Sequence, residues 1–127
     1  MEATTTEIAP DVFRLSVTLP DAPVIFDCFL IRDEQPAMVE TGLRQLFPLF
    51  RDAVSQLMDP ASLRHFIVPH FGMDECGSLN EFLAEAPEAE VITSPVGGLV
   101  TLADFAQTTP RVMGNGECCI SAARPCG

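Results

Sequence analysis

The chain has 127 residues, is 47% hydrophobic and carries a formal net charge of −11, with no Lys among its basic residues. This length suits one domain or part of one. An acidic chain without a basic patch is not expected to bind nucleic acid, and no apolar run approaches the ~20 residues that cross a membrane. Residues 1–11 are acidic and polar, unlike a signal peptide, so we expect a soluble, cytoplasmic protein.

The cysteines are five in number: Cys28, Cys76, Cys118, Cys119 and Cys126. An odd number without an export signal argues against a disulfide framework. No C-x-x-C motif occurs, and adjacent cysteines are poorly spaced for binding one metal ion. We therefore expect neither a zinc ribbon nor a thioredoxin-type site.

The first part of the chain is predicted to form an antiparallel meander of three strands. Residues 12–19 alternate apolar and polar side chains, which is the pattern of a half-buried strand. A turn containing two prolines leads to a more deeply buried strand at 24–32, and a second turn leads to a short strand at 37–42.

Helical spacing begins at residue 43. Apolar residues recur at positions 46, 47, 50, 54 and 57, which predicts an amphipathic helix over 43–58. Pro48 is compatible with the first turn of this helix.

The remaining elements alternate in type: a strand at 63–70, a helix at 78–86, a strand at 89–94 and a weak helix at 96–106. Ser78 and Glu81 match the S-x-x-E capping box at a helix start. Alternating strands and helices predict parallel strands joined by right-handed crossovers. The predicted fold class is therefore α/β (α+β), an antiparallel meander followed by β-α-β-α units.

The candidate functional residues lie in "VPHFGMDECGSLNEFL" (68–83), which follows the strand at 63–70. His70 ends a buried strand at the sheet edge where ligands commonly bind. If the chain stays extended, residues 70, 72 and 74 point the same way, and imidazole with carboxylates can bind zinc or iron. Gly72 has no ligating side chain, so His70, Asp74 and Glu75 do not make a closed site.

An ordinary strand-to-helix corner explains the same loop without a metal. Gly72 suits a turn, and Asp74 near a helix start is favoured by the helix dipole. The chemistry of these residues alone favours the corner. His65 lies on the opposite face of its strand from His70 by parity, and we expect it to be a packed or surface histidine.

Three segments in this order resemble the N-terminal half of the metallo-β-lactamase fold: "EIAPDVFRLSV", "CFLIRDEQPAMVETGLRQLFPLF" and "VPHFGMDECGSLNEFL". The similarity is greatest to the oxygen-binding di-iron branch, the flavodiiron proteins and their flavin-free relatives. Members of that branch carry H-x-E-x-D-[H/E]-x-G-[S/A]-L at this loop. The resemblance extends almost to Glu117, and it implies that residues 1–117 are the first half of an αββα sandwich.

The resemblance also assigns roles within the loop. His70 matches the first histidine ligand, Asp74 matches the aspartate ligand, and Glu75 stands where many members have a further histidine. Gly72 occupies the position of the glutamate ligand, which is histidine in the zinc hydrolases of the superfamily. The implied metal site at His70, Asp74 and Glu75 is therefore partial or vestigial.

The parent family implies a di-iron centre that binds O₂ or NO, with a flavoprotein or other redox partner as electron donor. We expect this chain to be inactive, because Gly72 replaces a ligand and the family's second half, with its further ligands, is missing. One alternative is a degenerate, non-catalytic binding or assembly domain, and another is a zinc-dependent hydrolase of the same superfamily. An uncovered sheet face in half a sandwich favours a homodimer.

Residues 118–127 form a Cys-rich tail that departs from the family pattern. In a GC-rich gene, a one-base shift after Glu117 would make this tail read Val-Leu-His-Leu-Gly-Gly, which suits the strand that the family has here. We therefore expect a frameshifted, truncated chain. A natural short variant with an incidental tail is the alternative, and sequencing the gene downstream of the Met113 codon distinguishes the two.

Overall fold

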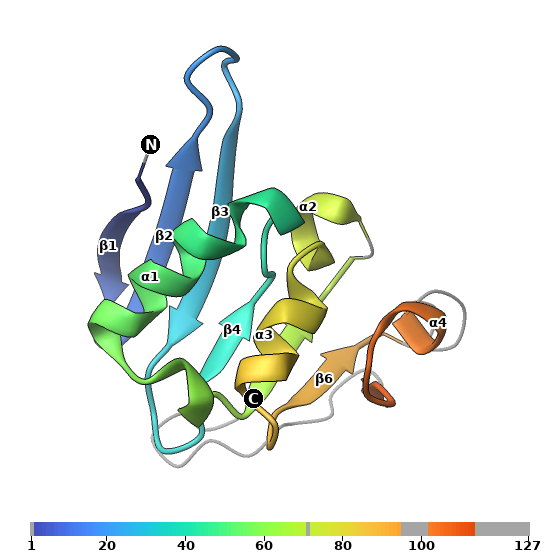
Figure 1. Cartoon of the computed structure of the whole chain (residues 1–127). Helices are drawn as coiled ribbons and strands as arrows, with labels where there is room; N and C mark the ends of the chain where they lie inside the picture. The colour runs from blue at the N-terminus through green and yellow to red at the C-terminus, as the bar shows by residue number, and fades with distance from the viewer. Residues whose placement is uncertain (1, 71, 95–101, 114–127) are drawn as a thin grey trace.

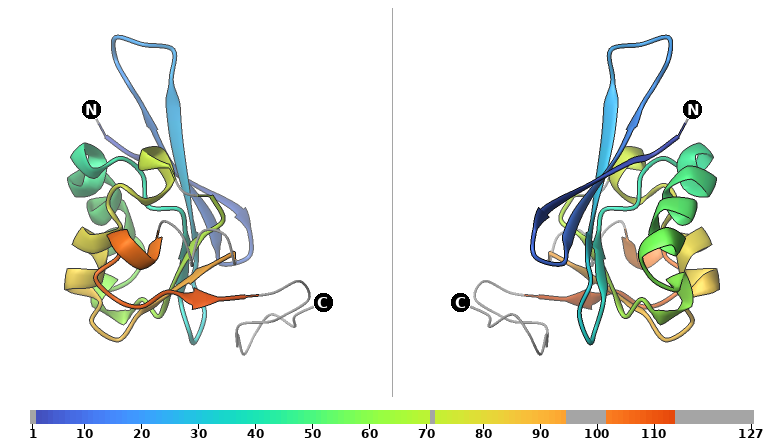
Figure 2. Two further views of the ribbon diagram at one scale, coloured as in Figure 1. Left: turned by 90° about the vertical axis from the view of Figure 1, so that its right-hand side faces the viewer. Right: turned by 90° about the vertical axis from the view of Figure 1, so that its left-hand side faces the viewer.

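The computed structural model describes residues 2–70, 72–94 and 102–113, with only the backbone of residues 73, 74 and 103. Within these residues, one sheet has seven strands in the order β1-β2-β3-β4-β5-β6-β7. The helices gather on one face of this sheet, as the two side views show (Figure 2). The predicted boundary between residues 117 and 118 lies outside the described residues.

The first four strands pair antiparallel in sequence order (Figure 1): β1 (Thr4–Ala9), β2 (Val12–Thr18), β3 (Ile25–Ile31) and β4 (Ala37–Val39). The predicted meander is confirmed, with β4 ending three residues earlier than expected. Strand β1 was not predicted. All of its residues are exposed, so it lacks the apolar alternation that marks a half-buried strand.

The second half of the sheet is parallel, because a connection with at least one helix leads from each of β4, β5 and β6 to the next strand. Its elements are η1 (Arg44–Leu46), α1 (Phe47–Leu57), η2 (Pro60–Ser62), β5 (His65–Val68), α2 (Met73–Cys76), α3 (Leu79–Glu85), β6 (Glu90–Thr93), α4 (Ala103–Phe105) and β7 (Arg111–Val112). The predicted parallel pairing is confirmed. Of the predicted helix at 96–106, the described part forms the single turn α4, and residues 95–101 lie outside the described residues.

The core lies between the sheet and the helices. Leu15, Leu30 and Phe66 of the sheet are fully buried, as are Phe50 of α1 and Phe82 of α3. The rings of Phe66 and Phe82 lie 5.7 Å apart between centroids. This packing fixes the two crossover helices on one face of the sheet, and it explains why their apolar spacing predicted them.

The opposite face of the sheet carries its own apolar side chains. The register places Phe29 of β3, Val39 of β4 and Ile67 of β5 in one row across the strands, and Ile31 lies two residues along β3. None of these four residues belongs to the core. We call this side of the sheet the open face, because no helix among the described residues covers it. None of the described helices is long and apolar enough to cross a lipid bilayer.

Candidate functional site

The predicted metal loop lies at the carboxyl end of β5, one of the parallel strands. Helix α2 follows this loop and lies beside the turn that connects β4 to α1 (Figure 1). This is the edge at which parallel sheets present ligand sites. Both segments that meet here leave the sheet from neighbouring strands.

Gly72 begins the short helix α2. Its carbonyl accepts hydrogen bonds from the backbone N–H of Glu75 (3.1 Å) and Cys76 (2.9 Å), and from Cys76 Sγ (3.1 Å). The corner therefore closes into one helical turn at Met73–Cys76, which the sequence did not predict. The chain is helical from Met73 to Cys76, so it is not extended from Gly72 to Asp74 as an alternating ligand set would require.

The turn after β4 holds α2 in place. The carbonyl of Glu75 accepts hydrogen bonds from the backbone N–H (2.6 Å) and the hydroxyl (3.1 Å) of Thr41, which is fully buried. The backbone N–H of Ser78 donates to the carbonyl of Gly42 (3.0 Å). Two backbone hydrogen bonds and one from a hydroxyl therefore join segments more than 30 residues apart.

The turn itself has an unusual backbone. Glu40 has φ of 64° and Gly42 has φ of 82°, both in the left-handed region. A Cβ added to Gly42 would lie 2.5 Å from Cε2 of Phe50. The predicted strand at 37–42 ends at Val39 because the chain turns here. Glycine at 42 is thus required both by backbone conformation and by close packing.

The predicted capping box is wrong. Helix α3 has no side-chain cap, because the hydroxyl of Ser78 donates to the carbonyl of Leu43 (2.8 Å). Glu81 instead accepts from Nε of Arg44 at 2.8 Å. Ser78 and Glu81 thus contact residues distant in the sequence, and a local sequence motif cannot predict such contacts.

Of the three predicted metal ligands, the structure describes the side chains of His70 and Glu75 but only the backbone of Asp74. His70 is exposed in the bend after β5, Glu75 is partly buried in α2, and Asp74 lies in α2. Within the ranges that the structure describes, no group of three or more His, Cys, Asp or Glu is placed to hold a metal ion. Gly72 offers only a carbonyl, and this carbonyl is engaged at the start of α2. The described donor set therefore does not fit a di-iron centre.

Glu40 is a charged residue at this end of the sheet that the sequence argument missed. Its backbone N–H donates to the carbonyl of Ile67 (2.9 Å), which places it beside the end of β5. Burial raises the pKa of the Cys28 thiol well above its ordinary value, and the carboxylates of Glu40 and Asp27 raise it further. The run "VETG" was the available signal, since a glycine after a short strand often marks such a turn.

His65 is a packed histidine, as predicted. It is 5% exposed, and its Nε2 lies 3.2 Å from Oε1 of Glu90, which also accepts from Arg111 at 3.0 Å. These three residues come from β5, β6 and β7. They form a structural polar cluster on the open face, away from the metal loop.

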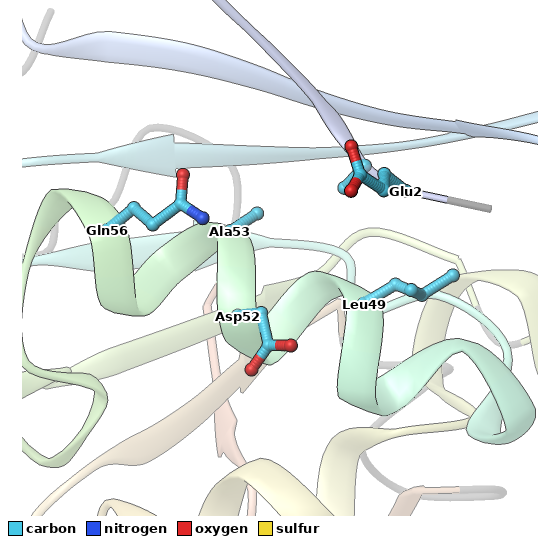
Figure 3. Close-up of a pocket in the computed structure, with 6 residues that line it drawn as sticks. Glu2, Leu49, Asp52, Ala53 and Gln56 are labelled. Atoms are coloured by element: carbon cyan, nitrogen blue, oxygen red, sulfur yellow. The ribbon is translucent and has the colours of Figure 1, made fainter.

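Among the described residues, two of the hollows lie on the helical side of the molecule. One of about 190 Å³ separates the N-terminal segment from α1 and is lined by Glu2, Asp52 and Gln56 among others (Figure 3). The other, of about 310 Å³, lies beside Gly77 and Asn80. Asn80 bonds both to the carbonyl of Phe105 (3.0 Å) and to the N–H of Gln107 (2.8 Å), which ties α4 to α3. Neither hollow is lined by His70 or Glu75.

Comparison with known sequences finds relatives for a little over half of the chain. Diflavin flavoprotein A 3 of Nostoc sp. (strain PCC 7120) is 34% identical over 71 residues, which is 56% of this chain and 12% of that protein. Flavo-diiron protein FprA2 of Clostridium acetobutylicum is 26% identical over 72 residues, 57% of this chain and 18% of that protein. No family model matches the chain. The matched stretch is thus less than a fifth of the length of either relative.

Comparison with solved structures covers more of the fold. A flavoprotein from Thermotoga maritima superposes with a TM-score of 0.76 and 23% identity, over 91% of this chain and 33% of that one. A metallo-β-lactamase from Cronobacter sakazakii superposes with a TM-score of 0.68 and 18% identity, over 89% and 48%. The chain therefore has the fold of the N-terminal half of the metallo-β-lactamase domain, and in sequence it is related to the diflavin and flavo-diiron proteins.

Proposed function

We propose that this chain is a flavodiiron-like domain that has lost catalytic activity and keeps only a vestigial metal loop. Gly72 carries this proposal. It stands at the position of a carboxylate ligand in the motif that the loop resembles, and its carbonyl starts α2 instead. A backbone carbonyl that already accepts two N–H groups does not replace a carboxylate bridge or ligand.

The packing of the loop supports the same reading. Thr41, Gly42 and Ser78 bind the loop by backbone and hydroxyl contacts, so contacts within the protein contribute to its shape. A structural metal usually contributes to folding directly, and its removal then unfolds the site. Contacts within the protein would supply that order in a domain retained for binding or assembly.

Metal content of the whole 127-residue chain tests the proposal. We expect the wild type to bind neither iron nor zinc tightly after anaerobic loading and desalting, as measured by elemental analysis. We expect Gly72→Glu to raise iron affinity at least tenfold in competition with a coloured chelator, because it returns a carboxylate between His70 and Asp74.

The double variant His70→Ala/Gly72→Glu is the control and should lose the gain. About one or two equivalents of iron in the wild type would overturn the proposal and favour an active O₂- or NO-binding centre. Zinc in its place would favour the hydrolase alternative. An unchanged iron affinity in Gly72→Glu would show that the assignment of position 72 is wrong.

Within the parent family, a flavoprotein or other redox partner would supply electrons, and we propose the same partner class for an active form of this domain. The inactive chain would keep the docking role without electron transfer, in the cytoplasm. We also propose that it forms a homodimer.

A further inference from the structure

We propose that the outer edge of β1 binds an extended, basic segment of a partner protein, which adds to the sheet as a further strand. This binding is independent of the metal loop and of the function proposed above. In recognition by strand addition, main-chain hydrogen bonds to the edge supply affinity, and pockets beside the edge select alternate side chains. Strand β1 has such an edge and such a pocket.

Strand β1 is an end strand of the sheet (Figure 1). Within the part of the chain that the structure describes, it pairs with β2 alone, and all of its residues are exposed. Natural sheets usually protect an edge with Pro, Lys, a bulge or a very short strand. The sequence TTTEIA has neither Pro nor Lys, and its register shift lies at the far end, between Glu7 and Ala9. The backbone of Thr4–Glu7 therefore presents a regular edge for pairing.

The pairing with β2 shows which side chains of β1 face the helices. Thr5 pairs with Leu15 and Glu7 pairs with Phe13, and both partners belong to the core beneath the helices. Directly paired residues point to the same face of a sheet, so Thr5 and Glu7 lie on the helix side. A strand added beyond β1 would lie about 4.8 Å away and point every second side chain to this side.

A hollow of about 190 Å³ lies on the helix side, between the segment before β1 and helix α1 (Figure 3). Three apolar and three polar side chains line it: Ala3, Leu49, Ala53, Glu2, Asp52 and Gln56. An apolar wall suits the methylene stem of a long side chain, and the carboxylates of Glu2 and Asp52 suit a positive charge at its end. The hollow therefore fits Lys or Arg.

Charge favours a basic segment over a second copy of this chain. Asp52 lies 4.0 Å from Arg51, but Nε of Arg51 lies closer to Glu85, at 3.0 Å. Glu7 adds a carboxylate on the helix side of β1, and its Oε2 accepts the backbone N–H of Asp11 at 3.1 Å. The whole chain has a net charge of −11, so two copies repel each other at this edge while a cationic segment is attracted.

Binding of short peptides to the whole chain tests the proposal. The probe is a labelled peptide of about nine residues in which Lys alternates with Thr, so that one face of the extended peptide is basic. Its fluorescence anisotropy is followed as the chain is added to about 300 µM. We expect saturable binding that weakens at least about tenfold when Glu replaces every Lys. No binding, or equal binding of the two peptides, would overturn the proposal.

Methylation of the peptide backbone separates strand addition from simple charge attraction. The Lys peptide with every backbone nitrogen methylated keeps its side chains and charges but has no N–H to donate to β1. We expect it to bind at least about tenfold more weakly than the unmodified peptide, because the ladder of hydrogen bonds cannot form. Equal binding would show that charge alone attracts the peptide and that no strand is added.

A pair of charge variants tests the hollow. Asp52→Lys, at a side chain that is 71% exposed, should fold normally and weaken binding of the Lys peptide about three- to tenfold. Asp104→Lys makes the same change of charge at an exposed site on α4, at the other end of the sheet, and should weaken binding less than about twofold. Thermal unfolding checks that both variants fold. Equal weakening by the two would show that the peptide does not use the hollow.

Amide hydrogen exchange of the isotope-labelled chain locates the contact. We expect the Lys peptide to slow exchange of those amides in Thr4–Glu7 that point away from β2. Protection of these amides without peptide, increasing with the concentration of the chain, would assign the edge to a second copy instead. Protection at another surface only would place the peptide elsewhere, and either result would overturn the proposal.

Discussion

Gly42 combines a left-handed backbone with a close contact. Its φ is 82°, and an added Cβ would lie 2.5 Å from the ring of Phe50, which is itself fully buried. We expect Gly42→Ala to lower the free energy of unfolding by about 2–4 kcal/mol, since strained φ and overpacking both contribute. Urea unfolding measures the change.

The same residue shows what the sequence revealed at this scale. The glycine after "VET" was visible, but its contact with Phe50 depends on how α1 packs against the turn. His65 was predicted to be a packed or surface residue on the opposite face of its strand from His70, and it is packed. The role of Gly72 as the start of α2 was not predicted, because an extended loop was assumed and a single helical turn has no periodicity to detect.

Ser78 connects the start of α3 to the turn before η1 and does not cap its own helix. This difference can be measured. Its buried hydroxyl donates to Leu43, whereas Glu81 pairs with Arg44 at the surface. We expect Ser78→Ala to cost about 1–2 kcal/mol and Glu81→Ala at most about 1 kcal/mol. Both values come from urea unfolding.

A double-mutant cycle distinguishes the tether from the cap. In a capping box the two side chains act together, so their effects would be coupled. Here their partners differ, and the two losses should add within about 0.5 kcal/mol. A larger coupling energy would restore the capping box.

Most elements with regular apolar spacing were predicted, and the missed ones share a physical cause. Strands β2 and β3 and helices α1 and α3 bury one side against the core, which imprints a period on the sequence. Strands β5 and β6 are buried at nearly every residue, which is typical of short apolar strands in a parallel sheet. Strand β1 is exposed along its length, and β7 has two residues. Their pairing depends on the neighbouring strand and leaves no period of its own.

At the scale of the molecule, the sheet has a covered face and an open face, which is the arrangement expected of half a sandwich. The apolar composition pointed to uncovered surface, but only the strand register shows which residues lie there.

Composition also determines how the stability of the chain changes at alkaline pH. It has no Tyr and no Lys, so thiols are the side chains that titrate between about pH 8 and 11.

Cys28, a buried thiol of β3, should contribute to that response. Burial raises its pKa in the folded chain, so above about pH 9 the unfolded state loses the proton first. Stability is therefore complete below the unfolded pKa and falls as the pH rises above it, by up to about 1.4 kcal/mol per pH unit. Urea unfolding with a reductant, at pH 7.5 to 10.5, measures this slope.

Two variants separate titration from packing. Cys28→Ala loses stability at neutral pH because it leaves a cavity, yet its free energy of unfolding should decline less between pH 9 and 10.5 than that of the wild type. Val17→Ala, at another fully buried position on the neighbouring strand, leaves a cavity but retains the thiol. Its pH slope should match that of the wild type. Equal slopes in all three proteins would show that the Cys28 thiol titrates alike in the folded and unfolded chain, contrary to its burial between the sheet and the helices.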